Sequence, residues 1–172
     1  HDALPIYKRY TFRAEKYAYA YVERKDGIVT LKIYQPKSTT RKWCNSGNSS
    51  VWDLWSQLPK TGDKLFITSS RKDALCLWEN TLIPAISMQG EGYIPKQSVI
   101  DELKSRFKNI YIFFDNDFDK EENHGRQYAQ FLSKTFDIPY IEIPDKYKAK
   151  DPSDFVKQYG RNKLKQLIKE LI

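Results

Sequence analysis

Two short stretches near the start of the chain alternate between apolar and polar residues with a period of two. They cover residues 17–22 and 28–34 and flank the dipeptide Asp26-Gly27. A period of two places every second side chain on the same face of a strand, and Asp-Gly favours the tight turn of a β-hairpin. The pattern therefore predicts an antiparallel hairpin.

The next stretch, residues 35–62, shows little periodicity and is rich in Pro, Ser, Asn and Gly. We expect a long irregular connection there, with one helical turn at 51–55. A connection of this length within a compact protein usually has a function or marks a boundary.

From residue 63 onward, short apolar runs alternate with stretches of helical period. The expected strands are 65–68, 83–88, 109–115 and 139–144, and the expected helices are 71–79, 95–107, 121–136 and a closing helix with Leu164, Leu167, Ile168 and Leu171 on one face. The expected inner-face residues are Leu75, Trp78 and Leu82 in the first helix, Ile100, Leu103 and Phe107 in the second, and Tyr128, Phe131, Leu132 and Thr135 in the third. Such an order predicts an α/β fold with a mostly parallel sheet, right-handed crossovers and helices on both faces.

The composition favours a polyanionic partner. Lysine and arginine number 29 against 22 acidic residues, which gives a formal net charge of +7. Nucleic acid is the partner that such a surface favours, although ordinary solvation is the alternative explanation. Residues 7–13 interleave basic and aromatic side chains, the composition that follows a nucleic-acid backbone and stacks on bases, while a solvated edge strand is the alternative there.

Cysteine and histidine are too few for a zinc site or a disulfide framework. The chain has Cys44, Cys76 and two histidines without paired spacing, so we expect no zinc within it and a reducing, cytoplasmic location. No apolar run approaches the roughly 20 residues of a membrane span, and no signal-peptide pattern is present, so we expect no membrane partner. Because the chain begins with His1-Asp2 and no Met, we expect it to be part of a longer protein.

The stretch from Ile110 to Asp119 carries the strongest chemical signal. Five bulky apolar residues lead directly into Asp115 and Asp117. Ligands of parallel α/β sheets bind beyond the carboxyl ends of the strands, so we expect both acids at a functional edge. Two residues apart on an extended backbone, their carboxylates are expected to point to the same side and to suit Mg²⁺ or Mn²⁺. A solvated acidic turn is the alternative interpretation.

Two other acidic motifs fit this stretch poorly. A calcium-binding loop requires Gly at its sixth position and Glu at its twelfth, where this chain has Lys120 and Arg126. A phosphatase with an aspartyl nucleophile resembles strand-Asp-x-Asp-x-Thr, but Asp119 stands in place of the Thr. Both interpretations are therefore disfavoured.

Four short motifs follow one another along the chain. They are Lys-Trp-Cys-Asn-Ser in 42–46, a strand leading to Asp73 in 65–75, Asp-Asn-Asp in 115–117, and Lys-Asp-Pro-Ser-Asp-Phe in 150–155. In this order they resemble the catalytic core of DnaG-type bacterial and phage primases, whose second half is a Toprim domain. The resemblance spans about two thirds of the chain. It implies a Toprim-like domain with a C-terminal helix over residues 61–172, preceded by a small antiparallel, basic β-hairpin (α+β) subdomain over residues 1–60.

The resemblance implies a nucleotidyltransferase that joins ribonucleoside triphosphates into short RNA primers on single-stranded DNA, with Mg²⁺ or Mn²⁺ as cofactor. A replicative helicase or a flanking zinc-binding domain is the further expected partner, and the location is the host cytoplasm if a phage encodes the chain. The candidate catalytic residues are Asp115, Asp117, Asp73 and Glu91, and the candidate metal ligands are Asp115, Asp117, Asp151 and Asp119. The candidate nucleotide or DNA contacts are Lys42, Asn45, Arg41, Arg9, Arg13, Arg71 and Lys72. An exposed turn is the alternative role for Glu91, and an ordinary surface position is the alternative for each basic residue.

Three departures from the family pattern bear on activity. Ser69 stands where the family has a Glu beside the metal site, so weaker activity, a different metal load or no activity is expected. Ser70 and Asp73 have the spacing of a helix capping box, which would occupy the Asp73 carboxylate without any metal. Residues 118–125 form an acidic insertion where the family has a short Gly-containing turn.

Two other functions fit the same residues. Toprim folds also host metal-dependent nucleases, and fold alone does not separate the two activities. The motif at 41–46 favours the primase, because a nuclease has no use for it. A non-catalytic single-stranded-DNA-binding module of a replication protein is the third interpretation, and Ser69 is its best argument. The chain lacks the Gly-x-x-x-x-Gly-Lys-Ser/Thr loop of NTP-driven motors.

Overall fold

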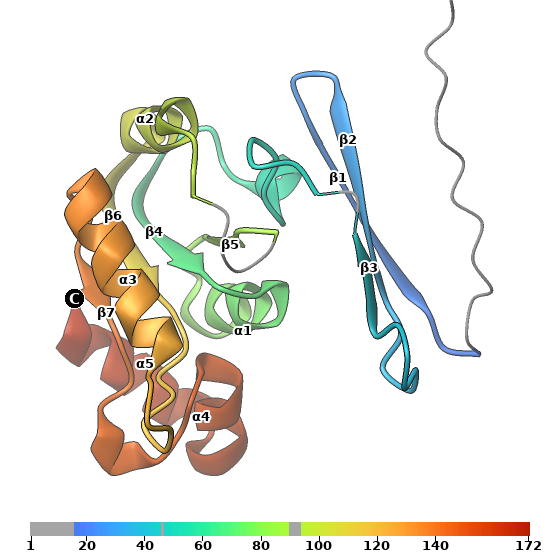
Figure 1. The fold of residues 1–172 in the computed structure, drawn as a ribbon. Helices are drawn as coiled ribbons and strands as arrows, with labels where there is room; N and C mark the ends of the chain where they lie inside the picture. The colour runs from blue at the N-terminus through green and yellow to red at the C-terminus, as the bar shows by residue number, and fades with distance from the viewer. Residues whose placement is uncertain (1–15, 46, 90–93) are drawn as a thin grey trace, which may run out of the picture.

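The computed structural model describes residues 16–45, 47–89 and 94–172, which form two sheets (Figure 1). The smaller sheet is antiparallel, with the order β1-β2-β3. Its strands are β1 (Tyr19–Lys25), β2 (Ile28–Tyr34) and β3 (Trp43–Asn45). Asp26 and Gly27 have φ angles of 49° and 76°, so the expected hairpin and its turn are confirmed.

The larger sheet is parallel, with the order β5-β4-β6-β7. Its strands are β4 (Gly62–Thr68), β5 (Ala85–Ser87), β6 (Phe107–Phe113) and β7 (Tyr140–Ile141). The helices are α1 (Arg71–Thr81), α2 (Gln97–Arg106), α3 (His124–Phe136), α4 (Pro152–Tyr159) and α5 (Arg161–Leu171), with short 3₁₀ helices η1 (Trp55–Gln57) and η2 (Asp145–Tyr147). No helix in the described part of the chain has the length and apolar character needed to cross a membrane.

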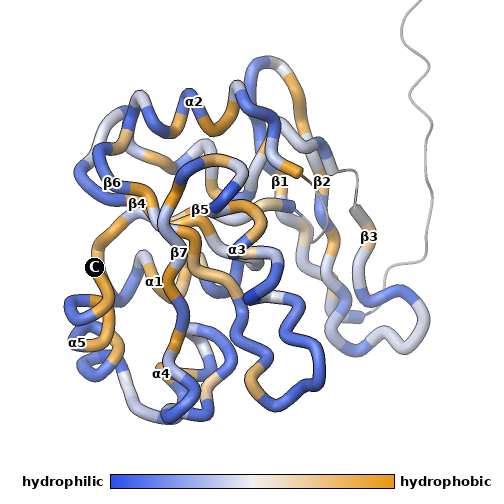
Figure 2. The backbone as a smooth tube through the Cα atoms, turned by 60° about the vertical axis from the view of Figure 1, so that its left-hand side comes forward, coloured by the Kyte–Doolittle hydropathy of each residue, from blue (hydrophilic) through white to orange (hydrophobic). Residues whose placement is uncertain are grey.

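Helices cover both faces of the larger sheet. α1 packs on β4 and β5 and against α4 and α5, while α2 and α3 pack on β6 and β7. In Figure 2 the helices carry both hydrophobic and hydrophilic stretches, as expected when one face of each lies on a sheet. The predicted fold class, a mostly parallel α/β sheet preceded by a small antiparallel sheet, is therefore confirmed.

Several predicted elements differ in their bounds. β6 begins at Phe107 and ends at Phe113, two residues before Asp115. The predicted helical turn at 51–55 is wrong, because Val51 and Asp53 form isolated β-bridges and the 3₁₀ helix η1 begins only at Trp55. The sequence analysis also missed α4, although Asp151-Pro152 is a recognisable helix start.

The inner faces predicted for α1 and α3 were partly wrong. Leu75 and Leu82 are 47% and 82% exposed, and Ala74 and Leu77 are buried instead. In α3 the buried side chains are Ala129, Leu132 and Phe136, whereas Phe131 and Thr135 are exposed. The faces predicted for α2 and the closing helix are confirmed, because Ile100, Leu103, Leu164, Leu167 and Ile168 are all buried.

A buried ionic cluster attaches the small sheet to the larger unit. We call it the junction, and it consists of Glu23, Lys32, Asp53 and Arg71. Glu23 accepts hydrogen bonds from the Leu54 backbone N–H (2.8 Å) and pairs with Arg71 (2.7 Å). Asp53 lies 3.6 Å from both Lys32 and Arg71. Two acids and two bases thus balance in the contact between the sheets.

The predicted division between residues 60 and 61 stays a prediction. Trp52, Leu54 and Trp55 precede it in sequence but belong to the same buried hydrophobic cluster as the larger sheet.

Candidate functional site

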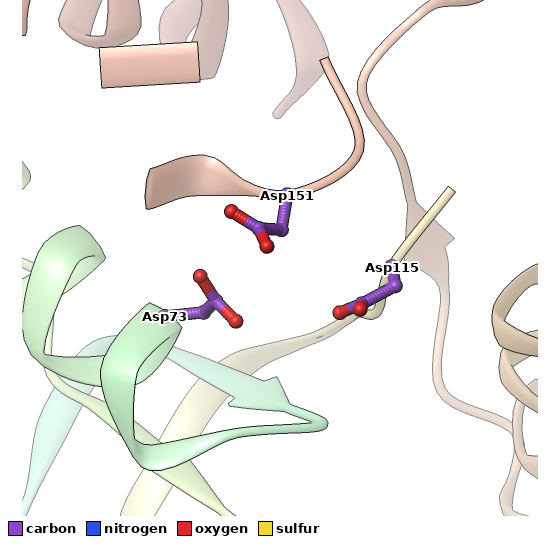
Figure 3. A group of neighbouring side chains, drawn as sticks. All are labelled: Asp73, Asp115 and Asp151. Carbon is purple, nitrogen blue, oxygen red and sulfur yellow. The ribbon is translucent and has the colours of Figure 1, made fainter. Parts of the chain in front are cut away.

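Three carboxylates from distant parts of the sequence converge beyond the ends of β4 and β6. Asp73, Asp115 and Asp151, which we call the acid triad, each offer one oxygen, and these oxygens all lie within 4.8 Å of one another. Figure 3 shows the three side chains pointing toward a common space. Asp73 and Asp151 are buried, and Asp115 is half-buried. Among the described residues, this is the group of acids, histidines and cysteines with the geometry to hold a metal ion.

Two of these acids are positioned by helix N-termini. Asp151 is the N-cap of α4, and its Oδ1 accepts a hydrogen bond from the Asp154 N–H at 2.7 Å. Asp73 lies in the first turn of α1, where Ser70 is the N-cap and accepts from the Asp73 N–H at 3.2 Å. The helix dipoles favour negative charge at both ends. The capping interaction that the sequence predicts does form, but the Asp73 carboxylate still faces the triad.

The loop after β6 is fixed by Asn116 and Gly125. The buried Asn116 donates its backbone N–H to the Lys150 carbonyl and its side-chain amide to the Ile143 carbonyl, both at 2.8 Å. These bonds hold Asp115 close to the segment that carries Asp151. A Cβ atom on Gly125 would lie 2.0 Å from the Asp115 carbonyl oxygen, so only glycine allows α3 to start against this backbone.

The acid triad is only partly neutralised by neighbouring bases. Burial, together with the Asp151 charge, raises the pKa of Asp73 to about 6, even though Ser70, Lys72 and Ser153 stabilise its carboxylate. Lys72 lies 2.8 Å from Asp151 and 3.7 Å from Asp73. An all-oxygen donor set that retains excess negative charge fits a hard divalent cation such as Mg²⁺ or Mn²⁺.

Ser69 supports Asp115 from the position where the sequence analysis notes the missing Glu. Its hydroxyl donates a hydrogen bond of 2.7 Å to Asp115 Oδ1. The position therefore orients an existing carboxylate and adds no fourth charge.

Asp117 faces a different environment from Asp115. Its Oδ1 lies 2.9 Å from Lys120 and 2.9 Å from Lys150, and Lys150 also lies 3.2 Å from Asp115. Burial opposes ionisation of Asp117, but the two lysines outweigh it and hold its pKa below the ordinary value. β6 ends at Phe113, so the backbone beyond it is not a strand, but Asp115 and Asp117 both contact Lys150 and line the same cavity. Only Asp115 belongs to the acid triad. Asp119 is exposed and is not part of the acid triad.

Two cavities meet at Asp115. The first, which we call the cleft, has a volume of about 880 Å³ and lies between the small sheet and α1, with the acid triad on its floor and Tyr34 and Trp43 on its wall. The second, which we call the α3 cavity, has a volume of about 470 Å³ and lies between the loop after β6 and α3. Ser69 and Asp115 line both.

The predicted basic residues fall into three groups. Lys72 lines the cleft, and Arg41 and Lys42 are exposed on the connection before β3. Arg71 also lines the cleft but is engaged in the junction, and its guanidinium lies 4.8 Å from the Tyr21 ring centroid. Asn45 ends β3, but its side chain lies outside the described part of the structure. The candidates Arg9, Arg13 and Glu91 lie outside the described residues, as does the basic and aromatic stretch 7–13.

Sequence reasoning overlooked residues that position the acids and bases. These are Glu23 and Asp53 in the junction, Asn116 and Gly125 around Asp115, and Ser153, which donates a 2.8 Å hydrogen bond to Asp73. Only Asn116, between the two acids, and Gly125, at the start of a helix, had a visible signal.

Comparison with known proteins shows which fold holds these acids. No protein-family model matches the chain, and no curated protein matches its sequence. A DnaG primase catalytic domain bound to single-stranded DNA superposes with a TM-score of 0.66 at 14% identity, covering 90% of this chain and 52% of that one. The RNA polymerase domain of Mycobacterium tuberculosis primase DnaG gives a TM-score of 0.62 at 15% identity, covering 87% of this chain and 54% of that one.

A phage structure is similar as well. The primase fragment of the bacteriophage T7 primase-helicase protein gives a TM-score of 0.59 at 18% identity, covering 90% of this chain and 62% of that one. The chain thus has the fold of DnaG-type primase catalytic domains, and it spans about half the length of the bacterial domains that it matches. The resemblance that the motifs predict is confirmed at the level of the fold.

Proposed function

We propose that this chain is the catalytic core of a DNA primase, a DNA-directed RNA polymerase that joins ribonucleotides into short primers on single-stranded DNA. The observation that carries the proposal is the convergence of Asp73, Asp115 and Asp151 on the floor of an open cleft. The likeness to primase folds, one of them solved with single-stranded DNA, supports it.

The proposed cofactor is Mg²⁺, with Mn²⁺ as its substitute. When bound, such an ion neutralises triphosphate charge and favours attack by a 3′-hydroxyl on the α-phosphate. Asp73, Asp115 and Asp151 would hold it, because their oxygens already converge. Asp117 and Asp119 remain proposed metal ligands from the sequence, but neither belongs to this group.

The chain's own bases and hydroxyls have separate proposed roles. Ser69 keeps Asp115 oriented toward the triad. Lys72 and Lys150 lie at the edge of the triad, and each ammonium carries three N–H donors, which suits contacts to phosphate. Lys42 and Asn45 remain the proposed contacts to nucleotide phosphate or sugar, and Arg41 a proposed contact to template phosphate.

The partners follow from the same proposal. They are a single-stranded DNA template, ribonucleoside triphosphates, and a replicative helicase or flanking zinc-binding domain. The similarity to the primase fragment of the bacteriophage T7 primase-helicase protein supports the helicase as a partner. A cytoplasmic location also belongs to the proposal.

A direct assay tests the proposal against its alternatives. The protein is incubated with single-stranded DNA, labelled ribonucleotides and Mg²⁺ or Mn²⁺, and the products are separated by length. Labelled oligoribonucleotides are the expected result, shortened DNA would indicate a nuclease, and unchanged but bound DNA a non-catalytic module. Asp115→Asn is expected to abolish synthesis, and Asp101→Asn, which changes an exposed acid of α2 outside the triad, is the matched control.

A further inference from the structure

Another cavity lies at the far end of the larger sheet from the acid triad. It has a volume of about 370 Å³ and is bounded by the first half of β4, the end of α1 and one face of α5. The acid triad lies beyond the carboxyl ends of the strands, so the two sites are separated by the length of the sheet. We call this cavity the α5 pocket, and the residues that determine its chemistry are Lys64, Leu82, Ile83, Lys165 and Lys169.

The charged side chains that line the α5 pocket are all lysines. Lys165 and Lys169 lie one turn apart on α5, and Lys64 comes from β4. Within the described residues, no aspartate or glutamate lines the pocket, and none of the three ammonium groups forms an ion pair. Three like charges without a counter-charge favour an anionic ligand.

Leu82 contributes an apolar rim that the fold itself does not require. It ends α1 with a φ of 62° and a ψ of 8°, the left-handed conformation that favours glycine at the end of a helix. Its side chain is 82% exposed, so it gains little burial in return for the strained backbone. Neither the end of the helix nor core packing explains a leucine here, whereas contact with a second molecule does.

The aliphatic lining restricts the kind of anion that fits. Leu82 and Ile83 offer contacts to another apolar side chain. No aromatic ring of the described residues lines the pocket, so it lacks the stacking surface that single-stranded nucleic acids use. A peptide that combines carboxylates with aliphatic side chains matches both the cations and the apolar rim, whereas a nucleic acid matches only the cations.

We propose that the α5 pocket docks an acidic, leucine-containing segment of a separate protein. One leucine side chain of the segment packs against Leu82 and Ile83, and its carboxylates contact the three lysines. Because the pocket and the acid triad lie at opposite ends of the strands, the docked protein leaves the cleft open. The inference does not rest on the proposed function.

Titration of the full chain with a defined probe tests this assignment. The probe is a fluorescently labelled synthetic peptide in which aspartate alternates with leucine, and its binding is measured by fluorescence anisotropy. Lys169→Glu is expected to weaken binding about tenfold, because it places a carboxylate against the acidic peptide. Leu82→Gly is also expected to weaken binding about tenfold, because it removes the apolar contact.

The stability of Leu82→Gly separates docking from a structural role. Glycine suits the left-handed conformation at this position, so the Tm of the variant is expected to be no lower than that of the unmodified protein. A variant that loses both peptide affinity and Tm would show that Leu82 serves the fold, and would contradict the assignment.

Matched controls separate docking from general attraction to a basic protein. Lys134→Glu makes the same charge change at an exposed lysine of α3, away from the pocket, and is expected to leave binding unchanged. A peptide with serine in place of leucine is expected to bind at least tenfold more weakly than the probe.

Four results would overturn the assignment. They are no binding of the probe, equal binding of the serine peptide, an equal effect of Lys134→Glu and Lys169→Glu, and displacement of the probe by single-stranded DNA. The last result would assign the pocket to nucleic acid instead. None of these measurements depends on whether the protein makes primers.

Discussion

The junction and the acid triad are both clusters of buried carboxylates, but their surroundings differ. In the junction, the buried Glu23 and Asp53 face Lys32 and Arg71, and the acids and bases are equal in number. In the acid triad, three carboxylates line the cleft and Asp115 also lines the α3 cavity, with Lys72 and Lys150 only at the edge. Buried acids whose charge is balanced by bases indicate a structural role, whereas excess negative charge beside a cavity indicates a binding role.

The largest expected effect is on stability and comes from the junction. Arg71→Met leaves Glu23 and Asp53 buried without their shared partner, so we expect the free energy of unfolding to fall by about 3–5 kcal/mol. Urea denaturation measures this change. Arg24→Met, which removes an exposed arginine next to Glu23 in sequence, is the control. An equal loss in both variants would contradict the structural role of the junction.

In the acid triad, we expect a substitution to reduce activity without reducing stability. Asp115→Asn is expected to lower primer synthesis by about a hundredfold to a thousandfold, since it removes charge that holds the ion. Its stability in EDTA is expected to equal or exceed that of the unmodified protein, because like charges are separated. A variant that is both inactive and strongly destabilised would show that the triad also has a structural role.

Addition of Mg²⁺ distinguishes the two clusters directly. An ion that binds only the folded chain stabilises it by about 2.7 kcal/mol at a hundred times its dissociation constant. We expect this gain in thermal unfolding of the unmodified protein and of Asp101→Asn, but not of Asp151→Asn. If Asp151→Asn were stabilised equally, the ion would have to bind elsewhere.

Substitution of Gly125 tests whether the position of the Asp115 carboxylate matters as well as its charge. Gly125→Ala keeps every carboxylate but forces Asp115 and α3 apart, because the added Cβ would lie 2.0 Å from a backbone oxygen. We expect primer synthesis to fall by about tenfold to a hundredfold. Gly27→Ala, which is strained by its φ of 76° but has nothing within 4 Å of the added Cβ and lies in the hairpin turn, is the control for a general loss of stability on replacing glycine. Equal activity in the two variants would contradict the positioning role.

The smallest expected effect is on the pH dependence of the free energy of unfolding in the absence of metal. Burial and Asp151 raise the pKa of Asp73 to about 6 from its ordinary value of 3.8, so the folded chain holds this proton more tightly than the unfolded chain. The contribution of Asp73 to stability is therefore expected to fall as the pH rises from about 4 to about 6, and to be constant above that. The free energy of unfolding, measured by urea denaturation in EDTA across this range, is expected to depend less steeply on pH in Asp73→Asn. The same pH dependence in both proteins would contradict the account.

The sequence predicts the features that depend on neighbouring residues, but not those that depend on contacts between distant parts of the chain. The apolar run before Asp115 predicts a buried strand with acids beyond its end, and the order of strands and helices predicts a parallel sheet. That Asp115 and not Asp117 joins Asp73 and Asp151 could not be predicted, because it depends on the end of β6 at Phe113 and on Asn116 bonds to residues about 30 positions away. The junction was missed for a similar reason, since Glu23 and Arg71 are 48 positions apart.

Diffraction from crystals soaked in Mn²⁺ tests the central claim most directly, because the anomalous signal locates the ion without reference to activity. The account predicts an ion bound by oxygens of Asp73, Asp115 and Asp151. No ion at these three residues, or an ion bound at Asp117 and Asp119 alone, would contradict it.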